Sequence, residues 1–128
     1  MITCVFDTNV LLRLFLRDIE SQFLETTRVL KEIEDEKSTG KLSALVVAET
    51  IWTFESVYKL NRKIVIEKLL SLVALKNIKI IEVKKDVLVE ILKRMIGNKL
   101  DFVDVYLSKI ATKKEIFSFD RDFKKLYR

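Results

Sequence analysis

The sequence has no histidine, no proline, a single cysteine and only two glycines among its 128 residues. Without histidine and with Cys4 alone, the usual zinc sites are excluded, as are catalytic Ser-His-Asp and Cys-His systems. One cysteine forms no intrachain disulfide, which fits a reducing cytosol. Any bound metal must therefore be held by oxygen, which favours Mg²⁺ or Mn²⁺. The scarcity of glycine and proline predicts few long loops and a chain dominated by helix.

The charge balance is basic, with 24 Lys and Arg against 19 Asp and Glu and a net charge of +5. Such a chain attracts polyanions, so nucleic acid is a plausible partner, although the same charge also simply keeps a protein soluble. No apolar run approaches the roughly 18 residues of a membrane span, and residues 1–5 lack the basic region of a signal peptide. We therefore expect a cytoplasmic protein with no membrane segment, folded as a single domain over residues 1–128.

Apolar spacing predicts strands that alternate with helices. Strands are expected at 2–6, 41–43, 78–82 and 116–119, the first of them buried on both faces. Helices are expected at 10–16, 20–37, 45–58, 62–75 and 86–96, with one more beginning after Asp101. Gly40 and Gly97 are expected to end the helices that precede them. This order indicates an α/β sandwich with a mainly parallel sheet.

Acidic side chains stand near the ends of these predicted strands. Asp7 follows the first strand, Glu49 lies in the helix after the second, and Asp104 lies in the helix before the last strand, which Asp120 and Asp122 follow. Sites in open α/β sheets form beyond the carboxyl ends of the strands, so these acids are expected to converge. Two carboxylates about 4 Å apart repel by about 4 kcal/mol at an effective dielectric near 20. A cluster therefore implies a divalent cation, which can activate water against a phosphodiester.

Each acid also has a purely structural interpretation. Asp7 can start a turn or cap the helix that follows it, Asp120 can cap the final turn, and Asp104 favours the dipole of its helix. Asp101 fits a helix N-cap, and this is the preferred interpretation for it. Glu49 stands among apolar residues, where burial without a partner is costly, but it can also point outward to a Lys or Arg.

Four blocks of the sequence resemble PIN domains, and VapC-type toxins in particular. They are VFDTNV at 5–10, AE at 48–49, DFVD at 101–104 and SFDRDF at 118–123. Each block is weak alone, but their order and spacing cover nearly the whole chain. The resemblance implies a PIN-like three-layer sandwich, with a four- to five-stranded, mainly parallel sheet flanked by helices.

The same resemblance implies a Mg²⁺- or Mn²⁺-dependent endoribonuclease that leaves a 5′-phosphate and a 3′-hydroxyl. It carries over four catalytic acids that also bind metal, one accessory metal ligand and two accessory polar residues. These are Asp7, Glu49, Asp104 and Asp120, then Asp122, then Asn9 and Ser118. Ser118 keeps the hydroxyl of the Thr that many members have.

Partners are also implied by the resemblance. They are an RNA substrate, a small antitoxin protein and a second copy in a homodimer. Residues 10–16 and the Phe54/Tyr58 region offer apolar surface for such contacts, although core packing is the commoner role for such residues. Cations near the acids are candidates for RNA contact, with solvated surface charge as the alternative for each. They are Arg13, Arg17, Lys99, Lys109 and Arg121, together with the pairs 113–114 and 124–125.

Three other functions fit the acids of this sequence less well. An aspartyl phosphatase generally needs a second acid two residues after its nucleophile, where this chain has Asn9. A phosphoacceptor receiver domain needs an acid pair at the end of the first strand, and the Asp7 block lacks one. A non-catalytic RNA-binding or assembly module with the same fold would usually lack one or more acids. All the expected acids are present, which favours the enzyme.

Overall fold

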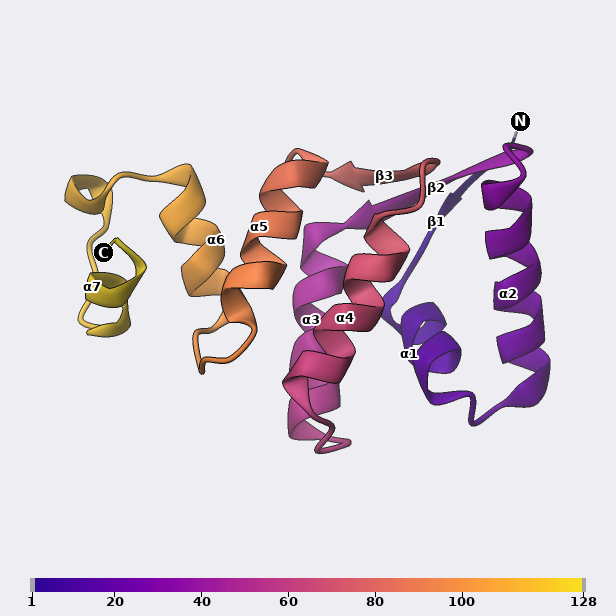
Figure 1. The fold of residues 1–128 in the computed structure, drawn as a ribbon, viewed down its shortest axis with the longest axis horizontal. Helices are drawn as coiled ribbons and strands as arrows, with labels where there is room; N and C mark the ends of the chain where they lie inside the picture. Colours follow the sequence, from indigo (N-terminus) through magenta and orange to yellow (C-terminus); the bar gives the residue numbers. More distant parts are fainter. Residues whose placement is uncertain (1, 128) are drawn as a thin grey trace.

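The computed structural model describes residues 2–127, and its centre is a parallel sheet. The strands are β1 (Ile2–Val5), β2 (Ser38–Ser43) and β3 (Ile78–Ile81), in the order β1-β2-β3 (Figure 1). Cys4 lies opposite Gly40, which in turn lies opposite Ile78. The predicted α/β class and parallel sheet are confirmed, but the described chain has three strands rather than four or five.

The predicted helices are present, with shifted ends. They are α1 (Thr8–Leu16), α2 (Glu20–Glu34), α3 (Ala44–Ser56), α4 (Arg62–Val73), α5 (Lys85–Met95) and α6 (Phe102–Ile110). A further helix, α7 (Asp122–Leu126), lies where the sequence predicted only a turn. Helix α2 packs on β2, while α4 and α5 pack on β3, and the core between them is apolar. None of the helices within residues 2–127 is long and apolar enough to cross a membrane.

Gly40 has a different role from the one predicted. It lies inside β2, whereas α2 ends at Glu34 and the chain turns at Glu36, whose φ is +62°. A Cβ on Gly40 would lie 2.7 Å from Ile78 Cδ1 and 2.9 Å from Phe6 Cε2, so glycine is needed for close packing. Gly97 does follow α5 with a φ of +78°, as a helix-ending glycine does.

Strand β1 is an edge strand and is not buried on both faces as predicted. Ile2 and Val5 are 68% and 67% exposed. Within residues 2–127, β1 pairs with β2 on one side and with no strand on the other.

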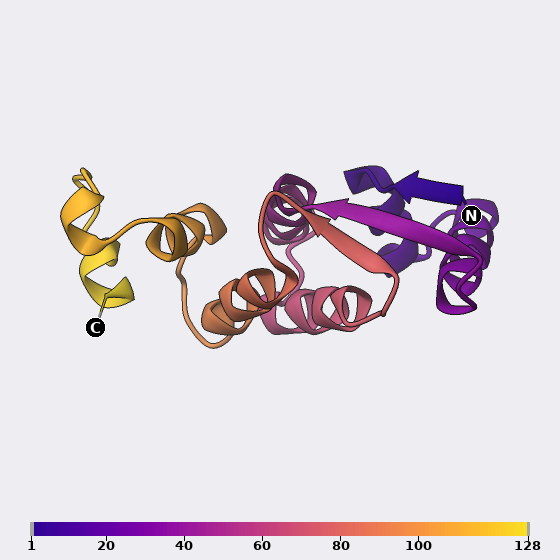
Figure 2. The same cartoon turned by 90° about the horizontal axis from the view of Figure 1, so that it is seen from above.

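The last predicted strand, at 116–119, is irregular in the structure. A strand forms only beside another strand that accepts and donates its backbone hydrogen bonds. This segment lies beyond α6, at the far end of the molecule from β1 (Figures 1 and 2). The local apolar pattern therefore predicted a strand whose neighbour is not within reach in this structure.

Residues 101–127, named here the C-terminal arm, contain α6, a short 3₁₀ turn (Lys113–Glu115) and α7. The arm is fastened to the rest of the chain at both ends. At its start, Phe102 and Val105 are buried and α6 packs on α5. At its end, the Arg94 guanidinium donates a 3.0 Å hydrogen bond to the Lys125 carbonyl.

Candidate active site

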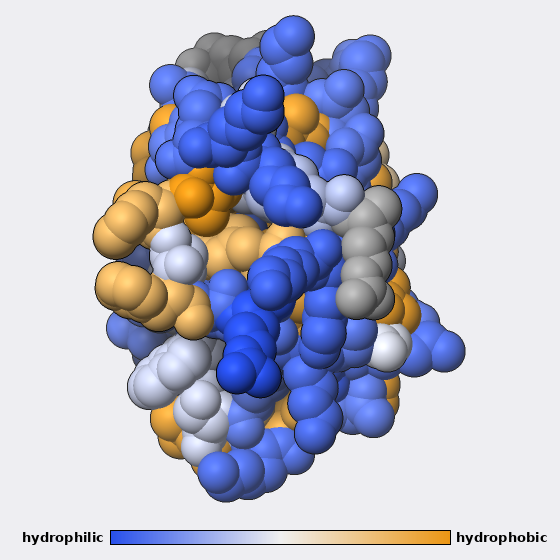
Figure 3. All heavy atoms as spheres, turned by 90° about the vertical axis from the view of Figure 1, so that its left-hand side faces the viewer, coloured by the Kyte–Doolittle hydropathy of each residue, from blue (hydrophilic) through white to orange (hydrophobic). Residues whose placement is uncertain are grey.

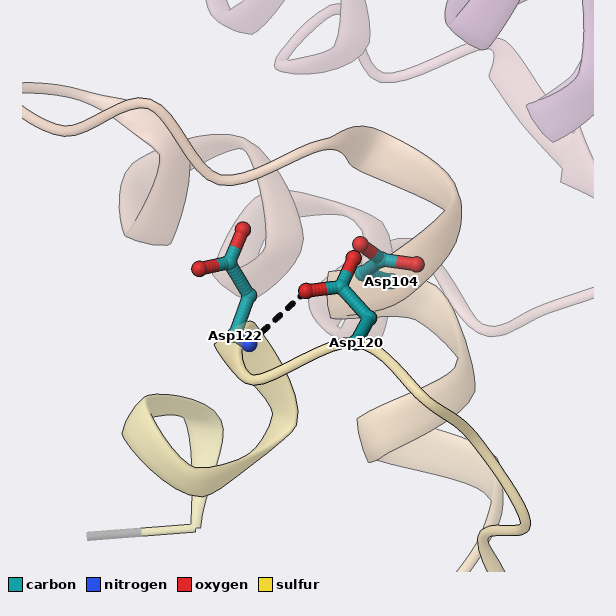
Figure 4. A group of neighbouring side chains, drawn as sticks. All are labelled: Asp104, Asp120 and Asp122. Atoms are coloured by element: carbon teal, nitrogen blue, oxygen red, sulfur yellow. Dashed lines mark hydrogen bonds between the residues drawn. The ribbon is translucent and has the colours of Figure 1, made fainter.

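The C-terminal arm brings three of the predicted acids together. Asp104, Asp120 and Asp122, named here the acid triad, each offer a carboxylate oxygen, and these oxygens all lie within 4.8 Å of one another (Figure 4). Asp104 comes from the first turn of α6, Asp122 is the first residue of α7, and Asp120 lies in the turn between. Two helix starts therefore place one cluster of oxygen ligands.

Backbone hydrogen bonds fix the shape of the triad. The Asp122 N–H donates to Asp120 Oδ1 at 2.9 Å, and the Asp120 N–H donates to Ser118 Oγ at 3.0 Å. The Asp122 carboxylate also lies 3.7 Å from the Lys125 ammonium. Ser118, predicted as an accessory polar residue, thus lies beside the triad and supports the turn that carries Asp120.

The electrostatics of the triad are unfavourable without a cation. Partial burial raises the pKa of Asp104, and the charges of Asp101, Asp120 and Asp122, with a side-chain hydrogen bond to Asp120, raise it further. Asp101 does occupy the N-cap position of α6, but its side chain makes no capping hydrogen bond, so the predicted capping bond is wrong. Its carboxylate instead adds to the negative potential at Asp104.

Asp7 and Glu49 are not part of this cluster. Asp7 is exposed, and its Oδ1 accepts a 2.9 Å hydrogen bond from the Val10 N–H, which caps α1. Asn9 is exposed in the same helix. Glu49 is exposed on α3 and makes no hydrogen bond or ion pair within residues 2–127. The structure therefore joins three of the five acids, because the arm lies at the opposite end from β1.

A basic hollow adjoins the triad at Asp122. It has a volume of about 440 Å³ and is lined by Arg94, Lys99 and Lys125, among others. The sequence had pointed to Lys99 and left Lys125 ambiguous, but it missed Arg94. Arg94 lies in the last turn of an amphipathic helix, where a cation is ordinarily solvated, so no local signal marks it.

Three of the other predicted cations are held by nearby acids. The pairs are Arg13 with Asp18 at 2.6 Å, Arg17 with Glu20 at 3.0 Å, and Lys109 with Glu90 at 3.0 Å. These three are therefore less available to a phosphate than Lys99 beside the triad.

The chain belongs to the PIN domain family, because the family model described as PIN domain matches residues 4–128. PIN domains are typically Mg²⁺- or Mn²⁺-dependent nucleases, and the acid triad is consistent with a divalent metal site. Searches among curated proteins and among solved structures gave no significant match.

Proposed function

We propose that this protein is a metal-dependent endoribonuclease that hydrolyses RNA at the acid triad, with Asp7 and Glu49 as further acids of the site. The observation that carries the proposal is the set of three carboxylate oxygens within 4.8 Å in a chain of the PIN domain family. The basic hollow beside Asp122 supports a polyanionic substrate.

The donor set fits a hard divalent cation. All three ligands are carboxylate oxygens, and such oxygens stand about 2.0–2.1 Å from Mg²⁺. Ligands of one ion are thus at most about 4 Å apart, so small side-chain rotations suffice to close a separation of 4.8 Å. Partial burial, followed by the neighbouring carboxylates, raises the pKa of Asp104, so its charged form is disfavoured there, and a bound cation would offset this penalty.

When bound, the cation supplies Lewis acidity and lowers the pKa of bound water. The side chains of the protein supply metal binding and phosphate binding. Asp104, Asp120 and Asp122 would hold the ion, while Ser118 keeps Asp120 in place. Lys99 and its neighbours in the basic hollow bind the phosphates that flank the scissile bond. By the resemblance, the products carry a 5′-phosphate and a 3′-hydroxyl.

We further propose that the protein is the toxin of a toxin–antitoxin pair, which rests on the resemblance of its four sequence blocks. A small antitoxin encoded beside it would then bind it and inhibit cleavage. Coexpression of the neighbouring small open reading frame should restore the growth that the nuclease suppresses. Growth inhibition unaffected by that neighbour would count against the toxin role while leaving the nuclease intact.

The central test compares Asp120→Asn with Asp86→Asn. Asp86 is also an acid in the first turn of a helix, but it lies on α5 outside the triad. Labelled single-stranded RNA should be cut by the wild type and by Asp86→Asn in Mg²⁺ or Mn²⁺, and left intact in EDTA. Asp120→Asn should lower cleavage by at least about 100-fold, the scale of losing a catalytic contact.

The rival function, a non-catalytic RNA-binding module, predicts a different result. Such a protein would retard RNA on a gel yet cut none, and Mg²⁺ would not raise its melting temperature. The nuclease proposal instead expects Mg²⁺ to raise the melting temperature of the wild type and not that of Asp120→Asn.

A further inference from the structure

The outer edge of β1 is uncovered apolar surface. Ile2 and Val5 are 68% and 67% exposed, and no strand within residues 2–127 pairs with this edge. A groove of about 380 Å³ runs beside it, lined by Phe6, Val10 and Val29, among others. An apolar edge strand of this kind is a template for a strand from elsewhere.

The exposed face of α3 carries further apolar side chains, and Leu45 lies beside α6. Leu45 is 75% exposed and Trp52 is 62% exposed, and the carboxylate of Glu49 lies between them on the same helical stripe. Helix α1, which Asp7 caps, contacts α3. Asp7 therefore lines the groove beside the uncovered edge, and Glu49 lies on the helix that contacts α1.

The C-terminal arm carries apolar side chains that match this surface. Phe117 is 90% exposed and Phe119 is 94% exposed, and their rings meet edge to face at 5.6 Å. This contact places both rings on the same side of the segment. Figure 3 views this end of the molecule and shows apolar side chains that protrude among charged ones.

We infer that two copies of this chain exchange their arms. Residues 116–119 of one copy add to the β1 edge of the other, with Phe117 and Phe119 covering the groove beside it. The acid triad of the first copy then meets Asp7 and Glu49 of the second. Mutual exchange forms a closed two-fold dimer with two composite sites. The composite site rests on the proposed function, whereas the exchange itself does not.

A second copy covers this surface while each arm keeps its packing on its own chain. Closure onto the arm's own β1 would need α6 to leave α5, exposing the buried Phe102 and Val105. It would also break the hydrogen bond from Arg94 to the Lys125 carbonyl and disturb the Leu100 carbonyl, which accepts from Arg62 Nη1 at 2.6 Å. The arm points away from its own β1, so the β1 of another chain is the accessible partner (Figures 1 and 2).

The first test is the mass in solution. Light scattering should give twice the chain mass of 15.0 kDa. The double variant Phe117→Lys/Phe119→Lys should be monomeric yet keep its circular dichroism spectrum, since both rings are exposed within one chain. Ile64→Lys is the control, because Ile64 is 54% exposed on α4, away from both surfaces. A monomeric wild type, or a dimer that survives the double variant, overturns the inference.

The second test separates exchange from closure within one chain. In a Cys4→Ser background, Val5→Cys and Phe119→Cys are combined and joined by a short bismaleimide. Exchange predicts a covalent dimer on a denaturing gel. A cross-linked monomer shows closure onto the chain's own β1 and refutes the exchange, and so does failure to cross-link.

The third test measures whether acids from two chains form one active site. Asp7→Asn and Asp120→Asn, each inactive alone, are mixed, unfolded and refolded together. Half of the dimers are then mixed, and each has one site with every acid intact, so about a quarter of the wild-type activity should return. No recovery beside an active wild type refutes the composite site. A wild type that is inactive yet dimeric, together with a covalent dimer of the Cys variant, would instead refute only the proposed nuclease.

Discussion

Asp104→Asn should make the metal-free protein more stable. Its carboxylate has two triad neighbours with oxygens no more than 4.8 Å away. At that distance each pair repels by about 1 kcal/mol even at the dielectric of water, and by about 3.5 kcal/mol at an effective dielectric of 20. The substitution forfeits a favourable interaction with the α6 dipole of about 0.3–1 kcal/mol. The balance is a gain of about 1 kcal/mol or more.

Urea and thermal unfolding in EDTA near neutral pH measure this gain. A stabilisation of about 1 kcal/mol raises the melting temperature of a domain of this size by about 4 °C. Asp86→Asn is the matched control, because it loses the same kind of helix-dipole interaction with no triad repulsion to relieve, and it should be destabilised. With saturating Mg²⁺ the wild type should be more stable than Asp104→Asn, since only the wild type has the full set of metal ligands.

The pH dependence has a defined sign. Because the pKa of Asp104 is raised in the folded state, the folded protein retains a proton there that the unfolded chain has already released. The free energy of unfolding of the metal-free wild type should therefore fall as pH rises from the ordinary Asp value through the raised one. Asp104→Asn should lack this slope. A variant less stable than the wild type in EDTA would show that the helix dipole outweighs the repulsion and would refute the reasoning.

Two further predictions concern packing and RNA contact. Gly40→Ala should lower the free energy of urea unfolding by about 1–3 kcal/mol, because its Cβ would meet Ile78 and Phe6 inside 3.0 Å; equal stability would disprove the close approach. Lys99→Ala should weaken RNA binding and reduce the salt slope by about 0.7, measured by fluorescence anisotropy against Lys68→Ala on α4. If Lys68→Ala had the same effect, RNA binding would depend on the net charge of the protein rather than on a contact in the basic hollow.

The helices and the parallel sheet were predictable because their signals are local. Apolar residues at helical spacing define α2 and α5, and short apolar runs define β1 and β3, whatever the rest of the chain does. The metal chemistry was also predictable, because it follows from the lack of histidine and of a second cysteine. A chain with no histidine and only Cys4 binds metal through oxygen, if at all, and Asp7 and Asp104 stand at helix starts that sequence alone can locate.

The position of the arm was not predictable in this way. Residues 116–119 have the composition of a strand, but a strand needs a neighbour, and the packing of Phe102 and Val105 on α5 carries the segment away from β1. The role of Gly40 was hidden for the same reason, since the side chains it touches come from Phe6, Ile33 and Ile78. Each of these facts depends on contacts between residues far apart in sequence.

The class of fold, the restriction of any bound metal to oxygen ligands and the candidate acids all follow from residue types and local patterns. Which of these acids meet is a property of the folded chain. Asp104, Asp120 and Asp122 converge because a short stretch of chain folds back on itself within the arm. Whether Asp7 joins them depends on where the arm docks, and that is set by the burial of apolar surface between distant segments, which no local pattern encodes.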